Sequence, residues 1–333
     1  MINWTHVSAE IAAFFSKAFP LTQDAAVQTF SFVATVWGAF YVKRLLTAKI
    51  NMLPFPSPLF PFADVVKNLS KSQIVPERAG NTFFALAPAV AVCCFLFLFL
   101  LMPFGEFTAA AFVQFGTLYM VFIIYAGVYA FVLSGFSTGS RFAFLGSVRA
   151  LMRLLCVQPV LCLVVAVVLM SAQSTRLHGI IEAQRAVWFI VPHFPMAVIF
   201  VACTLALSNN FRFEAPFSQK ELASGIYADY SAGLYLFLFW SDYALTVFMA
   251  MLGAFLFLGG TLAPFGWTFL SPEVWLGLKT AVFFLVFAAA ENTLPDYRSD
   301  QLLRVAFKRL LPVTIVWTVL TAIVCLSTGG GRP

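Results

Sequence analysis

The chain has 333 residues, of which 61% are hydrophobic and 10% charged, and its formal net charge is +6. So many apolar residues and so few charges exclude an ordinary soluble domain and predict a polytopic membrane protein. The positive charge does not indicate nucleic-acid binding, because the Lys and Arg residues gather on one side of the predicted helices, as membrane topology requires.

The N-terminal segment, residues 1–20, is predicted to be an amphipathic helix at the membrane interface. Its apolar face is formed by Val7, Ile11, Phe14, Phe15 and Ala18. These positions follow the period of a helix. The basic, apolar and cleavage regions of a signal peptide do not open the chain. A disordered leader is the alternative interpretation.

Apolar runs long enough to cross the hydrocarbon core predict an all-α fold with about eight transmembrane helices in a single transmembrane domain, 1–333. The predicted spans are 25–46, 83–102, 109–133, 154–171, 187–207, 232–262, 275–290 and 305–326. The sixth run is longer than a span needs and contains Gly253, Gly259 and Gly260. We therefore expect a tilt or a local break in it.

Orientation follows from the 20 Lys and Arg residues. Five of them fall on one side of the predicted helices: Lys17, Arg176, Arg185, Lys279 and Arg332. The other 15 (20 − 5) fall on the opposite side, in or beside the loops 47–82, 135–153, 209–231 and 291–304. This bias places those loops on the negative side of the membrane, the cytosol of a bacterium or the matrix of a mitochondrion.

The loop segment 61–71 is predicted to form a short amphipathic helix on the membrane surface or beneath a partner. Phe62, Val65, Val66 and Leu69 would form its apolar face, and Asp64, Lys67, Asn68 and Lys71 its polar face. The six cysteines form no CxxC pair and no Cys/His ligand spacing. The sequence therefore predicts neither a metal site nor an iron–sulfur cluster.

Four clusters of residues between positions 61 and 312 share segments with one known family. The first cluster is Pro61, Phe62, Ala63, Asp64, Lys67 and Leu69. The second is Gly135, Phe136, Ser137, Ser140, Ala143, Leu145, Gly146, Arg149 and Ala150. The third comprises Ala215, Pro216, Phe217, Glu221, Leu222, Gly225, Asp229, Tyr230, Gly233, Asp242, Tyr243 and Ala244. The fourth comprises Thr293, Leu294, Pro295, Tyr297, Arg298, Asp300, Gln301, Leu302, Leu311 and Pro312.

These clusters resemble loops of NADH dehydrogenase subunit 1, the membrane subunit that builds the quinone tunnel of respiratory complex I. Asp229 and Asp242 stand where the family has Glu. The family's acid–arginine pair at the end of the first membrane helix reads Lys43-Arg44 here, and a glutamate of the fourth span falls on Gln158. The chain is therefore identified as a divergent member of this family.

The resemblance implies a core membrane subunit of proton-pumping NADH:ubiquinone oxidoreductase, which couples quinone reduction to proton translocation. It implies ubiquinone as a substrate in the tunnel and no cofactor on this chain. FMN and iron–sulfur clusters are expected in the partners, which are peripheral redox subunits and other membrane subunits of complex I. The mitochondrial inner membrane is the expected location, and the bacterial plasma membrane is the alternative.

Carboxylates near a quinone are suited to proton coupling, because burial and nearby cations shift their pKa values. The candidates for this role are Asp64, Glu214, Glu221, Asp229 and Asp242. Candidates for the quinone tunnel and its loops are Phe62, Lys67, Arg149, Phe217, Tyr230 and Arg298. A carboxylate at membrane depth, such as Asp242, is costly and typically functional, whereas a loop acid also serves as a helix cap or docking contact.

Three other functions remain open at this point. The membrane subunit of an energy-converting hydrogenase resembles the same family and would lack quinone chemistry. A free-standing ion or proton transporter would favour internal inverted repeats, which the sequence does not show. The third alternative is a purely structural anchor for a peripheral arm. It would be excluded if variants of the loop acids assembled normally but lost turnover.

Overall fold

The computed structural model describes residues 35–45, 48–49, 57, 59–77, 79–102, 115–208, 225–264, 271–293 and 299–327. Within these ranges the regular structure is entirely helical. After helix 35–45, the helices are α2 (Phe60–Leu69), α3 (Asn81–Leu100), α5 (Gly116–Ser137), α6 (Arg141–Ala172), α7 (Leu177–Ala183), α8 (Phe194–Leu207), the 3₁₀ helix η1 (Gly225–Ala228), α10 (Ala232–Phe257), α11 (Pro272–Thr293), α12 (Ser299–Val305), the π-helix η3 (Ala306–Leu310) and α13 (Leu311–Ser327).

The all-α polytopic fold class is confirmed. Six helical segments in the described ranges are long and apolar enough to cross a membrane: 82–99, 116–137, 141–172, 232–257, 272–290 and 300–327. The predicted fifth span, 187–207, is shorter than expected, because α8 begins at Phe194 and has 14 residues. At 1.5 Å per residue, α8 spans only about 21 Å. The N-terminal segment 1–20 lies outside the described residues, as do residues 25–34 and 46 of the predicted first span.

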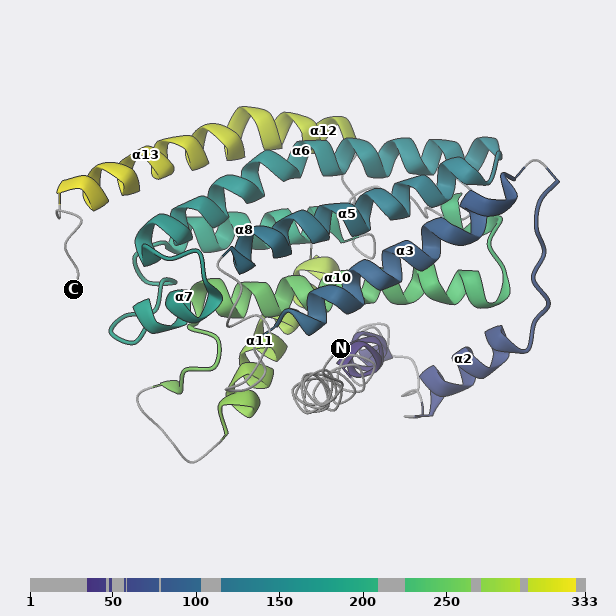
Figure 1. Ribbon diagram of the computed structural model, residues 1–333, viewed down its shortest axis with the longest axis horizontal. Helices are drawn as coiled ribbons and strands as arrows, with labels where there is room; N and C mark the ends of the chain where they lie inside the picture. Colours follow the sequence, from purple (N-terminus) through teal and green to yellow (C-terminus); the bar gives the residue numbers. More distant parts are fainter. Residues whose placement is uncertain are drawn as a thin grey trace, which may run out of the picture.

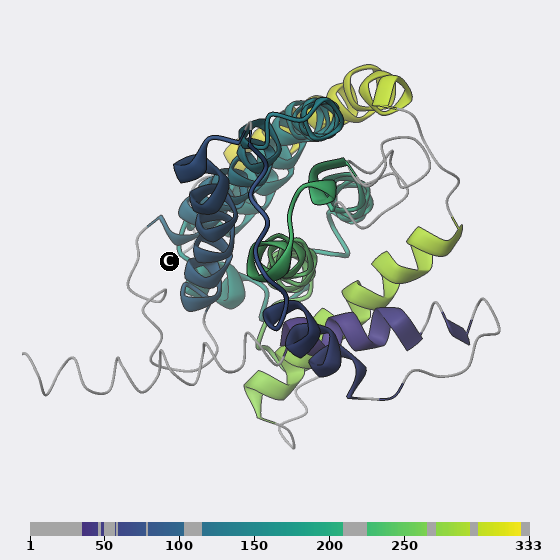
Figure 2. The same cartoon turned by 90° about the vertical axis from the view of Figure 1, so that its right-hand side faces the viewer.

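Helix α10 lies at the centre of the molecule (Figure 2). The helices α3, α5, α6 and α13 form a row in which each packs on the next, and α10 packs on α3 within that row (Figure 1). Helices α2, α8 and α11 also contact α10. In the membrane-length apolar stretch of α10, 78% of the residues are buried within the chain. In the stretch within residues 300–327, only 11% are buried. The last span therefore presents most of its surface outward, whereas α10 forms the core.

The expected break in the sixth apolar run occurs at its end. Helix α10 continues through Gly253 and ends at Phe257, after which Gly259 and Gly260 adopt φ values of +71° and +51°. A left-handed backbone favours glycine, since a side chain on Cβ would be strained there. Two consecutive glycines therefore turn the chain sharply at the end of α10.

Most of the segment 135–153, predicted as a loop on the negative side of the membrane, is helical. Helix α5 continues to Ser137, and α6 begins at Arg141, where the Ser140 hydroxyl accepts a hydrogen bond of 3.2 Å from the Ala143 amide. A serine N-cap of this kind satisfies one of the free amides at a helix start. Arg149 and Arg153 consequently lie on α6, and Arg153 is buried.

The crossing of α5, α6 and η1 depends on Gly135. A Cβ at this position would collide with the Ser147 hydroxyl and would lie 2.9 Å from a side-chain carbon of Ile226 and 3.0 Å from the Ala143 carbonyl oxygen. We expect Gly135→Ala to destabilise the protein by roughly 1–3 kcal/mol, the usual cost of overpacking a core. The thermal stability of the purified assembly measures this effect.

Gly277→Ala is the matched control, because Gly277 lies inside α11 and nothing approaches its Cβ position within 4 Å. Alanine is also the better helix former. This variant should be as stable as the parent or more stable. Equal melting temperatures for the two variants would contradict the close approach at Gly135.

Candidate functional site: an aromatic pocket beside α10

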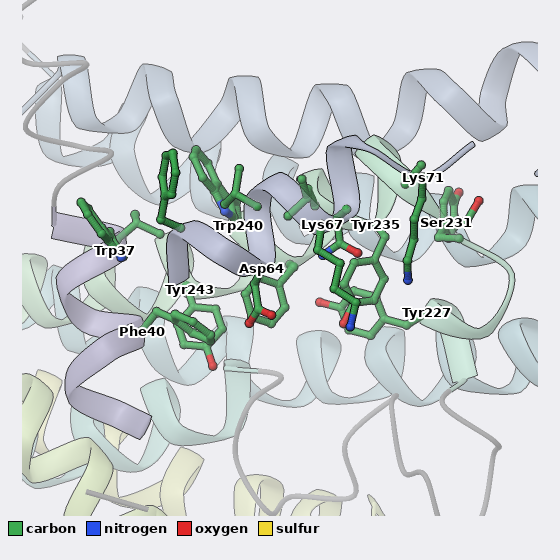
Figure 3. A pocket seen from close by; sticks show the side chains of 18 of the residues that line it. Trp37, Phe40, Asp64, Lys67, Lys71, Tyr227, Ser231, Tyr235, Trp240 and Tyr243 are labelled. Carbon is green, nitrogen blue, oxygen red and sulfur yellow. The ribbon is translucent and has the colours of Figure 1, made fainter. Parts of the chain in front are cut away.

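A pocket of about 660 Å³ lies between helix 35–45, α2, the segment around η1 and the first half of α10. Figure 3 shows side chains from these elements converging on it. Its lining includes Trp37, Phe40, Arg44, Phe62, Asp64, Lys67, Asn68, Lys71, Tyr227, Tyr230, Ser231, Tyr235, Phe239, Trp240 and Tyr243. The volume falls within the range usual for small-molecule sites.

One wall of the pocket is a continuous series of aromatic rings. Tyr235, Phe239 and Tyr243 are spaced four residues apart, so α10 presents them on one face. The ring centroids of Tyr235 and Phe239 lie 6.1 Å apart with the planes at 17°, and those of Phe239 and Tyr243 lie 4.9 Å apart. Tyr227 extends the series at 5.2 Å from Tyr235, and Phe40 meets both Phe239 and Tyr243 at 5.2 Å.

The opposite edge of the pocket is polar and comes mainly from α2. The predicted helix at 61–71 is confirmed, and its polar residues Asp64, Lys67, Asn68 and Lys71 line the pocket. On the other face, Val66 and Leu69 are 50% and 65% exposed. The described part of the chain leaves much of these two side chains uncovered, which agrees with an apolar face that meets a membrane or a partner.

Arg44 links the two edges of the pocket. Its guanidinium lies 3.5 Å from the Asp64 carboxylate and 5.0 Å from the ring centroid of Phe40. The neighbouring Lys43 ammonium lies 5.7 Å from the centroid of Tyr243. The two cations that stand where the related family has an acid–arginine pair therefore both contact the aromatic wall. Cations over ring faces are attracted by the ring quadrupole.

Tyr230 closes the inner end of the pocket. Its ring stacks on Phe84 with centroids 4.3 Å apart and planes at 4°. Its hydroxyl donates to the Ser134 carbonyl at 2.9 Å and lies 3.1 Å from the Ser137 hydroxyl. Burial raises the pKa of Tyr230 to about 12, so the phenol stays protonated at neutral pH. This residue is a rigid, neutral part of the pocket.

Asp242 is buried behind the aromatic wall, with 3% of its surface exposed, and it is not part of the pocket lining. One lining group, Tyr227, is connected to it electrostatically. Burial first, and then the negative charge of Asp242, raises the pKa of Tyr227 well above its usual value. The charge of Asp242 therefore acts on a group that lines the pocket.

The remaining predicted site residues do not all meet at this pocket. Asp229 is half-buried next to Tyr230, and its Oδ2 finds no hydrogen-bond partner among the described residues. Arg149 lies half-buried on α6 and is not among the lining residues. Four predicted residues, Glu214, Phe217, Glu221 and Arg298, lie outside the described part of the chain.

The sequence prediction did not identify the aromatic wall. Its signal was nevertheless present, because Tyr235, Phe239 and Tyr243 recur at helical spacing just before and after a buried acid. Trp37 and Phe40 recur at a helical spacing of three residues in helix 35–45. Aromatic residues are so frequent in this chain, with 40 Phe alone, that no single ring was conspicuous.

Comparison with known proteins places the chain in a family. A sequence profile described as NADH dehydrogenase matches residues 25–322. An NADH-quinone oxidoreductase subunit of Rhodospirillum rubrum is 35% identical over 294 residues, 85% of this chain and 87% of the relative. NADH-ubiquinone oxidoreductase chain 1 of Chondrus crispus is 35% identical over 272 residues, 81% and 83% of the two chains. The corresponding NADH-quinone oxidoreductase subunit of Rickettsia canadensis is 32% identical over 329 residues, 95% and 97% of the two chains. The chain belongs to the NADH dehydrogenase family of membrane subunits.

Proposed function

We propose that the aromatic pocket beside α10 is the quinone site of this chain. Relatives across most of the chain length are named subunits of NADH-quinone oxidoreductase, so the chain is a core membrane subunit of that enzyme complex, respiratory complex I. The observation that carries the proposal is the form of the pocket: an aromatic wall on α10 faces a polar edge on α2.

This arrangement suits the chemistry of a quinone. The head group is a flat ring, which packs well against the rings of Tyr235, Phe239 and Tyr243. Its two carbonyl oxygens accept hydrogen bonds, and Lys67, Lys71 and Arg44 at the polar edge are donors. An isoprenoid tail needs apolar walls, which Trp37, Leu236 and Trp240 provide. We propose ubiquinone as the natural quinone.

Quinone reduction takes up two electrons and two protons to form the quinol. In this proposal the electrons come from FMN and iron–sulfur clusters held by peripheral partner subunits, and this chain holds none of these groups. Negative charge that develops on the quinone raises the proton affinity of a nearby buried carboxylate. Asp242 is the proposed carboxylate for this response, and Tyr227 connects it to the quinone. Asp64, paired with Arg44, is the proposed acid at the pocket edge.

The proposed partners follow from the surfaces around the pocket. The exposed apolar face of α2 would meet the membrane surface or a peripheral redox subunit, and the regions near Asp229 and Arg149 would face the same subunits. The outward-facing last span would contact lipid or another membrane subunit. The chain is a membrane protein, and we propose that its membrane is the mitochondrial inner membrane or, alternatively, the bacterial plasma membrane.

The names of the relatives favour quinone reduction over the alternatives of a hydrogenase subunit or a free-standing transporter. A pocket with an aromatic wall also fits a planar head group better than it fits a small hydrated ion. In this proposal quinone reduction is coupled to proton translocation, and Asp242 binds and releases the proton.

The pocket is tested by Phe239→Leu, which keeps an apolar side chain and removes the ring. Aromatic pairs contribute about 0.5–1.5 kcal/mol beyond burial, so the KM for a short-chain quinone should rise about twofold to tenfold. The kcat should change little, because Phe239 has no acid–base role. Steady-state quinone reduction by the assembled complex gives both constants.

Phe122→Leu is the control for this substitution, because Phe122 lies on α5, is 71% exposed and does not line the pocket. Its KM should equal that of the parent complex. An unchanged KM in Phe239→Leu, with normal assembly, would remove this pocket from the quinone route.

Coupling is tested by Asp242→Asn, which preserves size and hydrogen bonding but cannot bind and release a proton. Loss of an acid–base group typically costs about 100-fold or more, so we expect a quinone-dependent kcat at least about tenfold lower and a matching loss of proton translocation. The complex should retain its full set of subunits. Turnover and proton uptake in reconstituted vesicles measure both activities.

The alternative for Asp242 is a structural ion pair. In that case the same variant should lose assembly or thermal stability, because its partner charge would be left unpaired in the membrane. Normal assembly with normal pumping would exclude Asp242 from the mechanism.

A further inference from the structure

The far end of α10 is buried, which creates a specific chemical problem. The last carbonyl groups of a helix have no amide partners within that helix. Where the protein excludes water, the missing partners are not replaced, and each unsatisfied group is costly. Helix α10 ends at Phe257, which is fully buried, and the chain then turns through Gly259 and Gly260.

Two of these carbonyls are satisfied by neutral groups from the segment between α7 and α8. The Gln184 side-chain amide donates to the Phe255 carbonyl at 2.9 Å, and the same side chain accepts from the Phe189 amide at 3.3 Å. The Ile190 amide donates to the Phe257 carbonyl at 3.0 Å. Gln184 is fully buried. The end of α10 is therefore fastened to the preceding connection by backbone and amide hydrogen bonds.

The carbonyls that follow surround the side chain of Lys279. Its ammonium donates to the carbonyl oxygens of Leu258 at 2.6 Å, Gly260 at 3.0 Å and Leu262 at 2.6 Å. Three acceptors match the three donors of an ammonium group. The same nitrogen lies 4.7 Å from the ring centroid of Trp188. Lys279 is only 6% exposed, so its charge is enclosed by oxygen atoms and an aromatic face.

The sequence did not predict the contacts of this lysine. The basic-residue pattern assigns Lys279 to the less positive side of the membrane, and the structure places it in α11 with its ammonium directed to the end of α10. Burying an ammonium group costs free energy unless all of its donors are hydrogen-bonded, and the three carbonyls around Lys279 meet this requirement. A positive charge at a helix C-terminus is also favoured by the helix dipole.

We propose that Lys279 is a positioning residue: from α11 it holds the C-terminal end of α10, and thereby fixes the height and rotation of the helix that carries Asp242. The consequence for catalysis rests on the proposed function of the pocket. Helix α10 is one continuous element from Ala232 to Phe257. A displacement at its far end therefore moves Asp242, and errors of about 1 Å in placement reduce enzymatic rates strongly.

Lys279→Met tests the proposal, because methionine preserves length and apolar bulk but removes the charge and all donors. Hydrogen exchange followed by mass spectrometry should show at least tenfold faster exchange of the amides in residues 254–262. The kcat for quinone should fall at least threefold, while the quinone KM stays within twofold, since the pocket-lining half of α10 ends at Tyr243. Lys308→Met, at an exposed lysine of η3, is the control and should change neither measurement.

Lys279→Arg retains a cationic donor and should recover at least half of the lost kcat and of the protection from exchange. Exchange in Lys279→Met equal to that in Lys308→Met would overturn the capping contact. Faster exchange with a normal kcat would overturn the positioning role. If Lys279→Met does not assemble, assembly of Lys279→Arg with protected amides supports the proposal, and failure of both variants contradicts it.

The exchange measurement needs no quinone. If Phe239→Leu leaves quinone kinetics unchanged, the pocket proposal fails while the exchange result still decides whether Lys279 holds α10. The two failures are therefore distinguishable.

Discussion

A backbone polar group inside a membrane must find its hydrogen-bond partner within the protein, and α10 is the helix on which this constraint bears most heavily. Helix α10 is surrounded by α3, α8 and α11, and its last turn is buried among its neighbours. Three groups supply the carbonyls at this end with donors: Gln184, the Ile190 amide and Lys279. The central helix is thus held by its neighbours instead of ending in solvent.

The two ends of α10 serve different purposes because they are packed differently. The C-terminal end is enclosed and closed by a charge that is fully hydrogen-bonded. The N-terminal half exposes one face to an open pocket, and that face carries rings instead of small packing residues. The charges opposite that face belong to α2 and helix 35–45, so a molecule in the pocket meets apolar surface on one side and ionic groups on the other. This asymmetry suits a ligand that is apolar except for its head group.

The elements that followed from sequence were those with a strong local signal. Apolar runs predicted the spans. The helical spacing of Phe62, Val65, Val66 and Leu69, opposite a polar face, predicted α2. The packing of α2 against the pocket did not follow, because an amphipathic pattern does not say which face meets the chain. All four polar residues of α2 line the pocket together with Phe62 and Val65, whereas Val66 and Leu69 are exposed.

The burial of two charged side chains did not follow from the sequence. The basic-residue pattern assigns Arg153 and Lys279 to sides of the membrane, but it does not predict whether a charge is enclosed by the protein. Both side chains are buried in helices. The cost of burying the Lys279 charge is offset by hydrogen bonds to backbone carbonyls between 17 and 21 positions away in the chain. Such a contact has no local sequence signature. An acid in an apolar run, such as Asp242, is conspicuous in sequence, but its connection to the pocket through Tyr227 depends on the packing around η1.

Coupling over a distance requires both a site that responds to charge and a frame that does not move when the charge changes. In the proposed mechanism Asp242 is the site that responds to charge, and the pKa of the neighbouring Tyr227, raised first by burial and then by the charge of Asp242, shows that the two groups interact electrostatically. In the same proposal the anchored end of α10 is the frame, because on a fixed helix a change in charge at the pocket would change the protonation of the carboxylate instead of displacing it. A carboxylate on a loosely held helix would relax away from a charged quinone, and the free energy available for proton transfer would be lost in that motion.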